Sequence, residues 1–265
     1  MSAGRIQILP QALPTRWLGR GAVVLDAVDS TNRWMKERWI QGECRHGAVV
    51  WADQQTAGRG RLGRTWDSPA GKNIYTSVLL EPPKARLTGI LSLMAGVAAV
   101  QAVHHLTGLD ARMKWPNDGV IGGKKFCGVL VEAGTEPSPW AIVGIGINVL
   151  GRPDAQFPHA TSLAEAGATV PREGLWTALM VELEAQYEAW LSHGDSWVVS
   201  QWRAKNATLG YRVQVVRPHE TPWIGVAQDI DATGSLVVLR DGERVTVTAG
   251  EVQVRLADGR YAPGS

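Results

Sequence analysis

The stretch QQTAGRGRLGRTW, from Gln54 to Trp66, is the most informative part of this 265-residue chain. Its glycines and arginines fall within seven residues, and no acid follows before Asp67: Gly58, Arg59, Gly60, Arg61, Gly63 and Arg64. Glycine lets backbone N–H groups approach a ligand closely, and arginine supplies a permanent charge with a fork of donors that fits phosphate or carboxylate. The stretch therefore predicts a movable loop that encloses a polyanionic ligand.

Other interpretations of this loop are weaker. The string GRGRLG also matches the glycine fingerprint of dinucleotide-binding proteins, and Glu81 lies where a ribose-binding acid would be expected. That fingerprint must open a helix, whereas residues 65–73 contain Pro69 and Gly71 and predict a loop. A segment of the RGG type, which binds single-stranded nucleic acid, is normally repeated and disordered, but this one occurs once. A solvated basic loop without a ligand is the remaining alternative.

The segments around the loop predict a mixed fold. Runs of β-branched and aromatic residues bounded by turn residues predict strands at 47–51, 73–80, 111–115, 126–133 and 140–149. Apolar residues at helical spacing predict helices at 33–39, 87–106, 175–191 and 197–205. After Leu209 only strands are predicted, at 211–216, 223–230, 235–239 and 244–254, with hairpin turns at Thr233-Gly234 and Asp241-Gly242. We expect an α+β fold with a mixed domain over residues 1–208 and a small barrel-like domain over 209–265.

The composition is typical of a soluble globular enzyme. Hydrophobic residues make up 45% and charged residues 20%, and the net charge is only +2, so the chain is no nucleic-acid polycation. The most apolar stretch, 87–103, is interrupted by polar residues and glycines and predicts a buried helix instead of a membrane span. Residues 1–20 lack the apolar core of a signal peptide. The two cysteines, Cys44 and Cys127, have no metal-like spacing, which favours a reducing, cytoplasmic location.

Several catalytic patterns are absent from the sequence. The six histidines show no ligand spacing, and no G-x-S-x-G elbow occurs. The segment GGKK lacks the upstream glycine and the following Ser or Thr of a phosphate-binding P-loop. Neither a protein-held metal nor covalent catalysis by the enzyme is therefore predicted.

Five ordered segments carry a resemblance to a known family. The run QTAGRGRLGRTW resembles the signature loop of biotin–protein ligases. KWPND (Lys114–Asp118), followed by GGKKFCGVLVEA, is similar to the second motif of that family, and GIGINV (Gly144–Val149) is similar to the third. FPHATSL (Phe157–Leu163) also fits, and DSTN (Asp29–Asn32) is similar to the first ligand-binding element. The resemblance extends from about residue 25 to the C-terminus.

The resemblance implies both a fold and a function. The fold would be a catalytic domain like that of class II aminoacyl-tRNA synthetases, with a mixed sheet, followed by an SH3-like C-terminal barrel. The enzyme would use ATP with Mg²⁺ to activate biotin as biotinyl-5′-AMP, and would transfer biotin to a lysine of a biotin carboxyl carrier protein. Bifunctional members carry an N-terminal helix-turn-helix domain. Because only about 25 residues precede DSTN, we expect a monofunctional ligase with no DNA or membrane partner, and a homodimer stays open.

The resemblance also implies roles for individual residues. The catalytic residues would be Lys114, Arg59 and Arg61. Biotin would be bound by Ser30, Thr31, Asn32, Gln55, Arg59, Gly60, Arg61 and Lys114. The nucleotide would be bound by Arg59, Arg61, Arg64, Trp66, Asn148 and Arg255, the last from a GE-x-x-x-R run that begins at Gly250.

Simpler structural roles compete with these assignments. Residues 30–32 precede a helical segment and also fit a helix N-cap. Lys114 would fit an edge-strand position that prevents aggregation, and Gly144 and Gly146 would fit close packing within a strand. Trp66 and Trp115 suit adenine stacking and core packing equally well. For the whole chain, a lipoate–protein ligase-like enzyme and a non-catalytic biotin- or nucleotide-binding regulator are the alternative functions.

Overall fold

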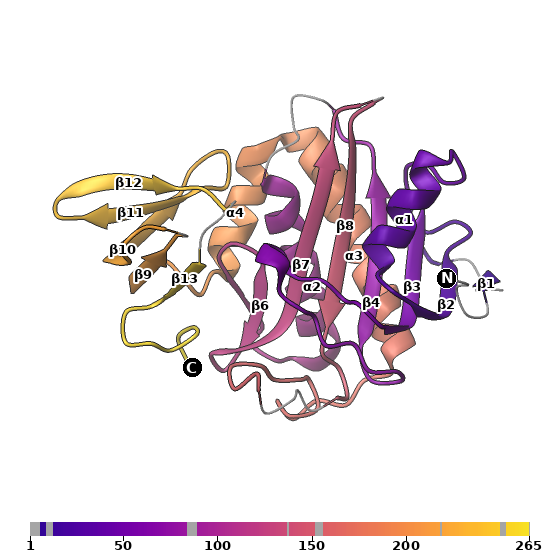
Figure 1. The fold of residues 1–265 in the computed structure, drawn as a ribbon, viewed down its shortest axis with the longest axis horizontal. Coiled ribbons are helices and arrows are strands. Elements are labelled where there is room, and N and C mark those ends of the chain that lie inside the picture. Colours follow the sequence, from indigo (N-terminus) through magenta and orange to yellow (C-terminus); the bar gives the residue numbers. More distant parts are fainter. Residues whose placement is uncertain are drawn as a thin grey trace.

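An eight-stranded mixed sheet is the largest element of the computed structural model (Figure 1), which describes residues 6–8, 13–83, 89–136, 138–151, 156–217, 219–249 and 253–264. Its order is β1-β2-β3-β4-β8-β7-β6-β5. Strands β2 and β3 run parallel, and the other neighbouring pairs are antiparallel. The strands are β1 (Ile6–Ile8), β2 (Val23–Val28), β3 (Val49–Gln55), β4 (Ile74–Leu80), β5 (Arg112–Lys114), β6 (Asp118–Ile121), β7 (Lys124–Gly134) and β8 (Trp140–Ile147).

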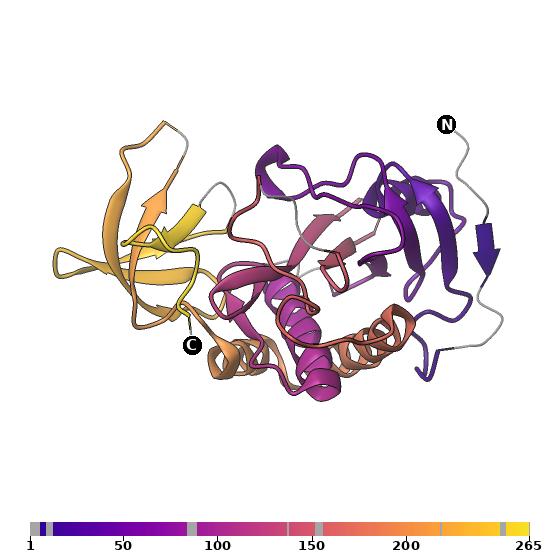
Figure 2. The ribbon, with the colours of Figure 1, turned by 90° about the horizontal axis from the view of Figure 1, so that it is seen from below.

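Helices cover the two faces of this sheet unequally. Three of them, α2 (Ile90–Thr107), α3 (Arg172–His193) and α4 (Asp195–Lys205), lie on one face, and α1 (Thr31–Ile40) lies on the other (Figures 1 and 2). Alternation along the strands explains the two layers, because successive side chains point to opposite faces. In β3, Val49 and Trp51 belong to the large core under α2 and α3, whereas Val50 and Ala52 pack with Met35 of α1.

Strand β8 shows how the sequence leaves room for a site. Its residues Ala141, Val143, Ile145 and Ile147 are buried in the large core. On the opposite face, Ile142 packs in the smaller core with α1, and the next alternate positions are Gly144, Gly146 and Asn148. Gly146 lies beside Gly128 of β7. The α1 face of the sheet therefore has a floor of small residues beyond the end of the smaller core.

A second, antiparallel sheet follows α4, with strand order β12-β11-β10-β9-β13. Its strands are β9 (Arg212–Val216), β10 (Trp223–Ile230), β11 (Leu236–Arg240), β12 (Glu243–Val247) and β13 (Gln253–Leu256). The expected α+β class is confirmed, and so are both hairpin turns: Thr233-Gly234 joins β10 to β11, and Asp241-Gly242 joins β11 to β12 with positive φ angles of 51° and 89°.

The single strand predicted over 244–254 was wrong. The structure divides this stretch into β12, which pairs with β11, and β13, which pairs with β9 at the other edge of the sheet. The alternating pattern identified the strand state but not the break, because pairing partners are set by tertiary structure.

Helix α2 matches the buried helix expected near residue 90, although residues 87 and 88 of the expected range lie outside the described residues. Among the described residues it is the one helix long and apolar enough to cross a membrane, but 67% of it is buried inside the protein. Core helices of globular proteins have the same property, so the length and composition of α2 are weak evidence for a membrane span.

Candidate active site

A cavity of about 860 Å³ opens on the α1 side of the large sheet. It is bordered by the start of α1, the arginine–glycine loop, β5, β7 and β8, and by β13 of the C-terminal sheet. All the site residues expected from the sequence line it: Ser30, Thr31, Asn32, Gln55, Arg59, Gly60, Arg61, Arg64, Trp66, Lys114, Asn148 and Arg255. The fold thus brings together residues that are spread over more than two hundred positions of the chain.

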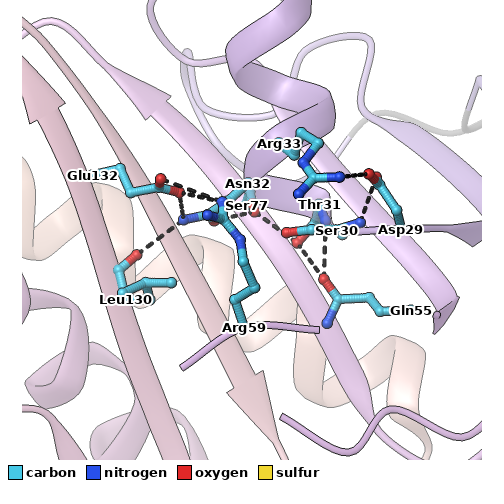
Figure 3. Close-up of polar contacts among 10 residues, drawn as sticks. All are labelled: Asp29, Ser30, Thr31, Asn32, Arg33, Gln55, Arg59, Ser77, Leu130 and Glu132. Carbon is cyan, nitrogen blue, oxygen red and sulfur yellow. Dashed lines mark hydrogen bonds and ion pairs between the residues drawn. The ribbon is translucent and has the colours of Figure 1, made fainter. Parts of the chain in front are cut away.

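The start of α1 supplies a cluster of buried polar groups. Ser30 is the N-cap residue, as the sequence indicated, but its side chain makes no capping hydrogen bond. The Thr31 backbone N–H and hydroxyl donate to Gln55 Oε1 at 2.9 and 3.1 Å (Figure 3). The helix start and the end of β3 therefore hold each other in a fixed position at the cavity wall.

A second set of contacts connects α1 to the loop. Ser77 Oγ lies 2.7 Å from Asn32 Oδ1, and Asn32 Nδ2 donates to Glu132 Oε2 at 2.8 Å. Arg59 Nη2 donates to the same Glu132 carboxylate at 3.1 Å (Figure 3). Arg59 is thus paired with Glu132 of β7, in the part of the site that Asn32 and Ser77 form.

The loop itself folds back as a short hairpin. Gly60 N–H donates to Arg64 O at 2.7 Å, and Trp66 N–H donates to Gly58 O at 2.9 Å. A single three-residue 3-10 turn, Arg61–Gly63, lies at its tip. Because no helix follows the glycines, the dinucleotide fingerprint is excluded. A Cβ at Gly58 would collide with the Trp66 carbonyl and the Ser68 hydroxyl, so close backbone approach explains the glycine there.

Arg61 extends from the loop in a different direction from Arg59. Its guanidinium donates to Asn117 Oδ1 at 3.1 Å and to the Ala249 carbonyl. Burial lowers the pKa of Arg61, while the nearby Asp118 carboxylate opposes that shift. Arg61 therefore connects the loop, the KWPND segment and the C-terminal sheet at one point.

Lys114 ends β5, which is an edge strand, yet its side chain is only 6% exposed. Burial lowers the pKa of its ammonium to about 8, against the opposing effect of Asp118. Its Nζ lies 4.4 Å from the centre of the Tyr261 ring and forms no ion pair with any residue in the described ranges. A gatekeeper lysine would point into solvent, so that alternative does not fit this geometry.

The buried carboxylate beside Lys114 is Asp118. Lys125 Nζ lies 2.5 Å from its Oδ1, and the Tyr261 hydroxyl donates to its Oδ2. Burial alone would raise the pKa of Asp118, but Lys125 and Lys114 hold it below its usual value. Asp118 is therefore a carboxylate whose two oxygens already have partners.

The structure separates the two tryptophans. Trp115 is fully buried and donates its indole N–H to Gly234 O at 2.9 Å, so it belongs to the core between the two sheets. Trp66 lines the cavity and lies against the glycine floor, where an added Cβ at Gly128 would be 2.9 Å from its ring. Close packing, the simpler role considered for Gly144 and Gly146, accounts for both glycines, because added Cβ atoms there would collide with the side chains of Asn32 and Trp66.

Comparison with known proteins identifies one family over both parts of the chain. Residues 24–148 match the biotin/lipoate A/B protein ligase family, and residues 208–255 match the biotin protein ligase C-terminal domain. The biotin–[acetyl-CoA-carboxylase] ligase of Mycobacterium tuberculosis is 36% identical over 88% of this chain and 90% of its own length. This chain belongs to the biotin protein ligase family.

Structures of this family share its fold. The biotin protein ligase of Aquifex aeolicus, solved in complex with biotin and ATP, covers 90% of this chain and 100% of its own, with a TM-score of 0.79 and 29% identity. The bifunctional ligase/repressor of Escherichia coli is 32% identical over 91% of this chain and 76% of its own length.

In this biotin protein ligase, the sequence did not single out five residues that the structure brings into the site network: Ser77, Asp118, Lys125, Glu132 and Tyr261. Asp118, Lys125 and Glu132 lie inside the quoted motifs, so the motifs contained a signal for them. Glu132 is an acid on a mostly apolar strand, which is also a usable signal. Tyr261 lies in the last turn of the chain, where the local sequence gives no indication of a site. Gly250 and Glu251 of the GE-x-x-x-R run lie outside the described residues, but Arg255 lines the cavity.

Proposed function

We propose that this member of the family activates biotin with ATP and transfers it to a lysine of a biotin carboxyl carrier protein. In the first step a biotin carboxylate oxygen attacks the α-phosphorus of ATP, the bond to pyrophosphate breaks, and biotinyl-5′-AMP forms. In the second step the neutral amine of the acceptor lysine attacks the biotinyl carbonyl, an amide forms, the amine loses a proton and AMP leaves.

The network around the start of α1 is the proposed site for the ureido ring of biotin. That ring is compact and has two N–H donors and one carbonyl acceptor. Ser30, Thr31, Asn32 and Gln55 offer hydroxyl and amide groups that can both donate and accept, and their positions are fixed by one another and by Ser77. Such preorganised polar groups in a pocket favour specificity for one ligand shape.

The cations around Lys114, in the part of the cavity away from the start of α1, support the adenylation step. Bringing a carboxylate to a triphosphate joins two anions, and the repulsion must be offset in the transition state. Lys114, Arg61 and Arg255 line this part, with Arg64 and Trp66 beside them. We assign Lys114 to the biotin carboxylate and the α-phosphate, and Arg61, Arg64 and Arg255 to the nucleotide phosphates. Arg59 is assigned to the biotin end, since its partner is Glu132.

Magnesium would enter with the nucleotide. Within the described part of the chain, no group of three or more His, Cys, Asp or Glu is placed to hold a metal ion. Mg²⁺ commonly binds through substrate phosphates with few protein ligands, so the Mg–ATP complex is the proposed substrate. No protein nucleophile is needed, and burial raises the pKa of the nearby Cys127 thiol to about 12.

The observation that carries this proposal is the convergence of the predicted site residues on one cavity in a chain of this family. The test is an ATP–pyrophosphate exchange assay with biotin or lipoate as the acid. We expect exchange that depends on biotin and is not supported by lipoate. Exchange with lipoate alone would favour a lipoate ligase, and biotin binding without any exchange would favour a non-catalytic regulator.

We assign the catalytic function to residues 1–208 and a supporting function to residues 209–265, with no DNA partner. A homodimer stays open. Both cysteines are free thiols, with Cys127 buried and Cys44 half-buried, which suits the cytoplasmic location proposed from the sequence.

A further inference from the structure

The segment after β13 returns to the large sheet and reaches the active site. It turns at Asp258-Gly259, and Ala262 is buried with Val120 and Ala207. At Gly123, in the β6–β7 turn, an added Cβ would lie 2.9 Å from the Ala262 carbonyl oxygen. Figure 1 shows the yellow C-terminal segment ending beside this hairpin. Residues 256–264 lie outside both stretches that match the family profiles.

Tyr261 is the residue of this segment that enters the cavity. Its hydroxyl donates to Asp118 Oδ2. One side of its ring stacks on His159, with 5.7 Å between the ring centres and an interplanar angle of 20°. Lys114 Nζ lies 4.4 Å and Arg255 Cζ 5.8 Å from the ring centre. One hydrogen bond and three ring contacts thus fix its position among groups assigned to the reaction.

The charges around Asp118 raise a specific problem. Its buried carboxylate interacts with Lys125, Lys114 and Arg61. A carboxylate and an ammonium that approach in a site of low dielectric attract strongly. If either carboxylate oxygen of Asp118 turned toward Lys114, the two would form an ion pair, and the charge of Lys114 would no longer be available to the substrate. Lys125 occupies Oδ1 at 2.5 Å, and Tyr261 occupies Oδ2. Lys114 instead faces the ring of Tyr261, which stabilises a cation without cancelling its charge.

We propose that Tyr261 is a positioning residue for biotin adenylation: its hydroxyl holds Asp118 away from Lys114, and its ring keeps the Lys114 ammonium charged and directed to the substrate anions. The role rests on the proposed function. It differs from a purely structural role, in which Tyr261 would only fasten the end of the chain to the β6–β7 hairpin.

The first test replaces Tyr261 with phenylalanine, which keeps the ring and removes only the hydroxyl. We expect single-turnover biotinyl-AMP formation at neutral pH to slow about tenfold. The melting temperature should fall by no more than a few degrees. With Oδ2 released, Asp118 can pair with Lys114 and raise the pKa of Lys114. The alkaline limb of the pH profile, which is the fall in rate as Lys114 loses its proton, should therefore move to higher pH. Tyr211→Phe, at an exposed tyrosine directly before β9, is the control and should have the rate and pH profile of the wild type.

The second test is a double-mutant cycle with Asp118→Asn. If Tyr261 acts through Asp118, Tyr261→Phe should have little further effect in the Asp118→Asn background. The proposal is overturned if Tyr261→Phe keeps the wild-type rate and alkaline limb, or if its rate loss is the same in both backgrounds. A wild-type protein that forms no biotinyl-AMP would overturn the proposed function itself, and that outcome is separate because it appears before any substitution is made.

Discussion

Lys114 carries the most direct prediction for a single residue. Lys114→Ala should slow biotinyl-AMP formation by roughly 10²–10³, because a charge-assisted contact made in the transition state is lost. Lys114→Arg should restore little activity, since a planar guanidinium spreads the charge over a larger group. The measurement is the single-turnover rate of both variants, with thermal melts to verify folding. Lys124→Ala, at an exposed position of β7, is the control.

A near-normal rate for a folded Lys114→Ala would contradict the role assigned to this residue and would weaken the whole arrangement of cations around it.

The lowered pKa of Lys114 predicts a pH dependence. Burial brings that pKa to about 8, and only the protonated form carries the charge that the reaction needs. The kcat/KM for adenylation, which reports on the free enzyme, should therefore be constant below that pH and fall as the pH rises above it. In Lys114→Arg the guanidinium stays charged, so the smaller remaining activity should lack this limb. An identical limb in Lys114→Arg would assign it to another group.

The arginine–glycine loop carries the prediction at the level of an element. In the structure it is held through Arg59 to Glu132 and through Arg61 to Asn117 and Ala249, while its tip has few buried contacts. We predict that the loop opens readily without ligand and is ordered by biotin or its adenylate. Limited trypsin cleavage after Arg59, Arg61 and Arg64 should slow markedly when biotin and Mg–ATP are added.

Cleavage at other exposed arginines, such as Arg244 in the C-terminal sheet, should not change. Equal cleavage of the loop with and without ligands would show that its conformation does not depend on them.

At the level of the whole molecule, the two sheets contribute to one site. Trp115 bonds to Gly234, Arg61 bonds to Ala249, and Arg255 lines the cavity. Deleting residues 209–265 should therefore impair ligation, but it would also expose Trp115 and lower stability. Arg255→Ala in the full chain isolates the contribution to the site. It should raise the KM for ATP about tenfold or more through loss of a phosphate contact, with the melting temperature nearly unchanged.

The exposed Arg244, whose Nε donates to Gln228, is the matched control for Arg255 and should be replaceable by alanine without a change in KM. A normal KM in Arg255→Ala would leave the C-terminal sheet with a structural role alone.

The sequence by itself determined the α+β class, most strands and helices, and the residues of three motifs. These depend on local chemistry: alternation of apolar residues along strands, turn residues such as Asp241-Gly242, and the density of glycine and arginine in residues 54–66. Short elements such as β6, four residues within a turn-rich segment, were missed because they carry too few residues for a periodic signal.

Only the tertiary structure decided which side chains meet. Tyr261 and Asp118 are 143 positions apart, and Arg59 and Glu132 are 73 positions apart, so no local pattern links them. The tertiary structure also placed Trp115 in the core and Trp66 at the cavity. The two side chains are equally hydrophobic, so residue type alone did not predict which of them is buried. The physical reason is that burial and pairing depend on the order of strands in the sheet and on the return of the chain end, which are properties of the whole fold.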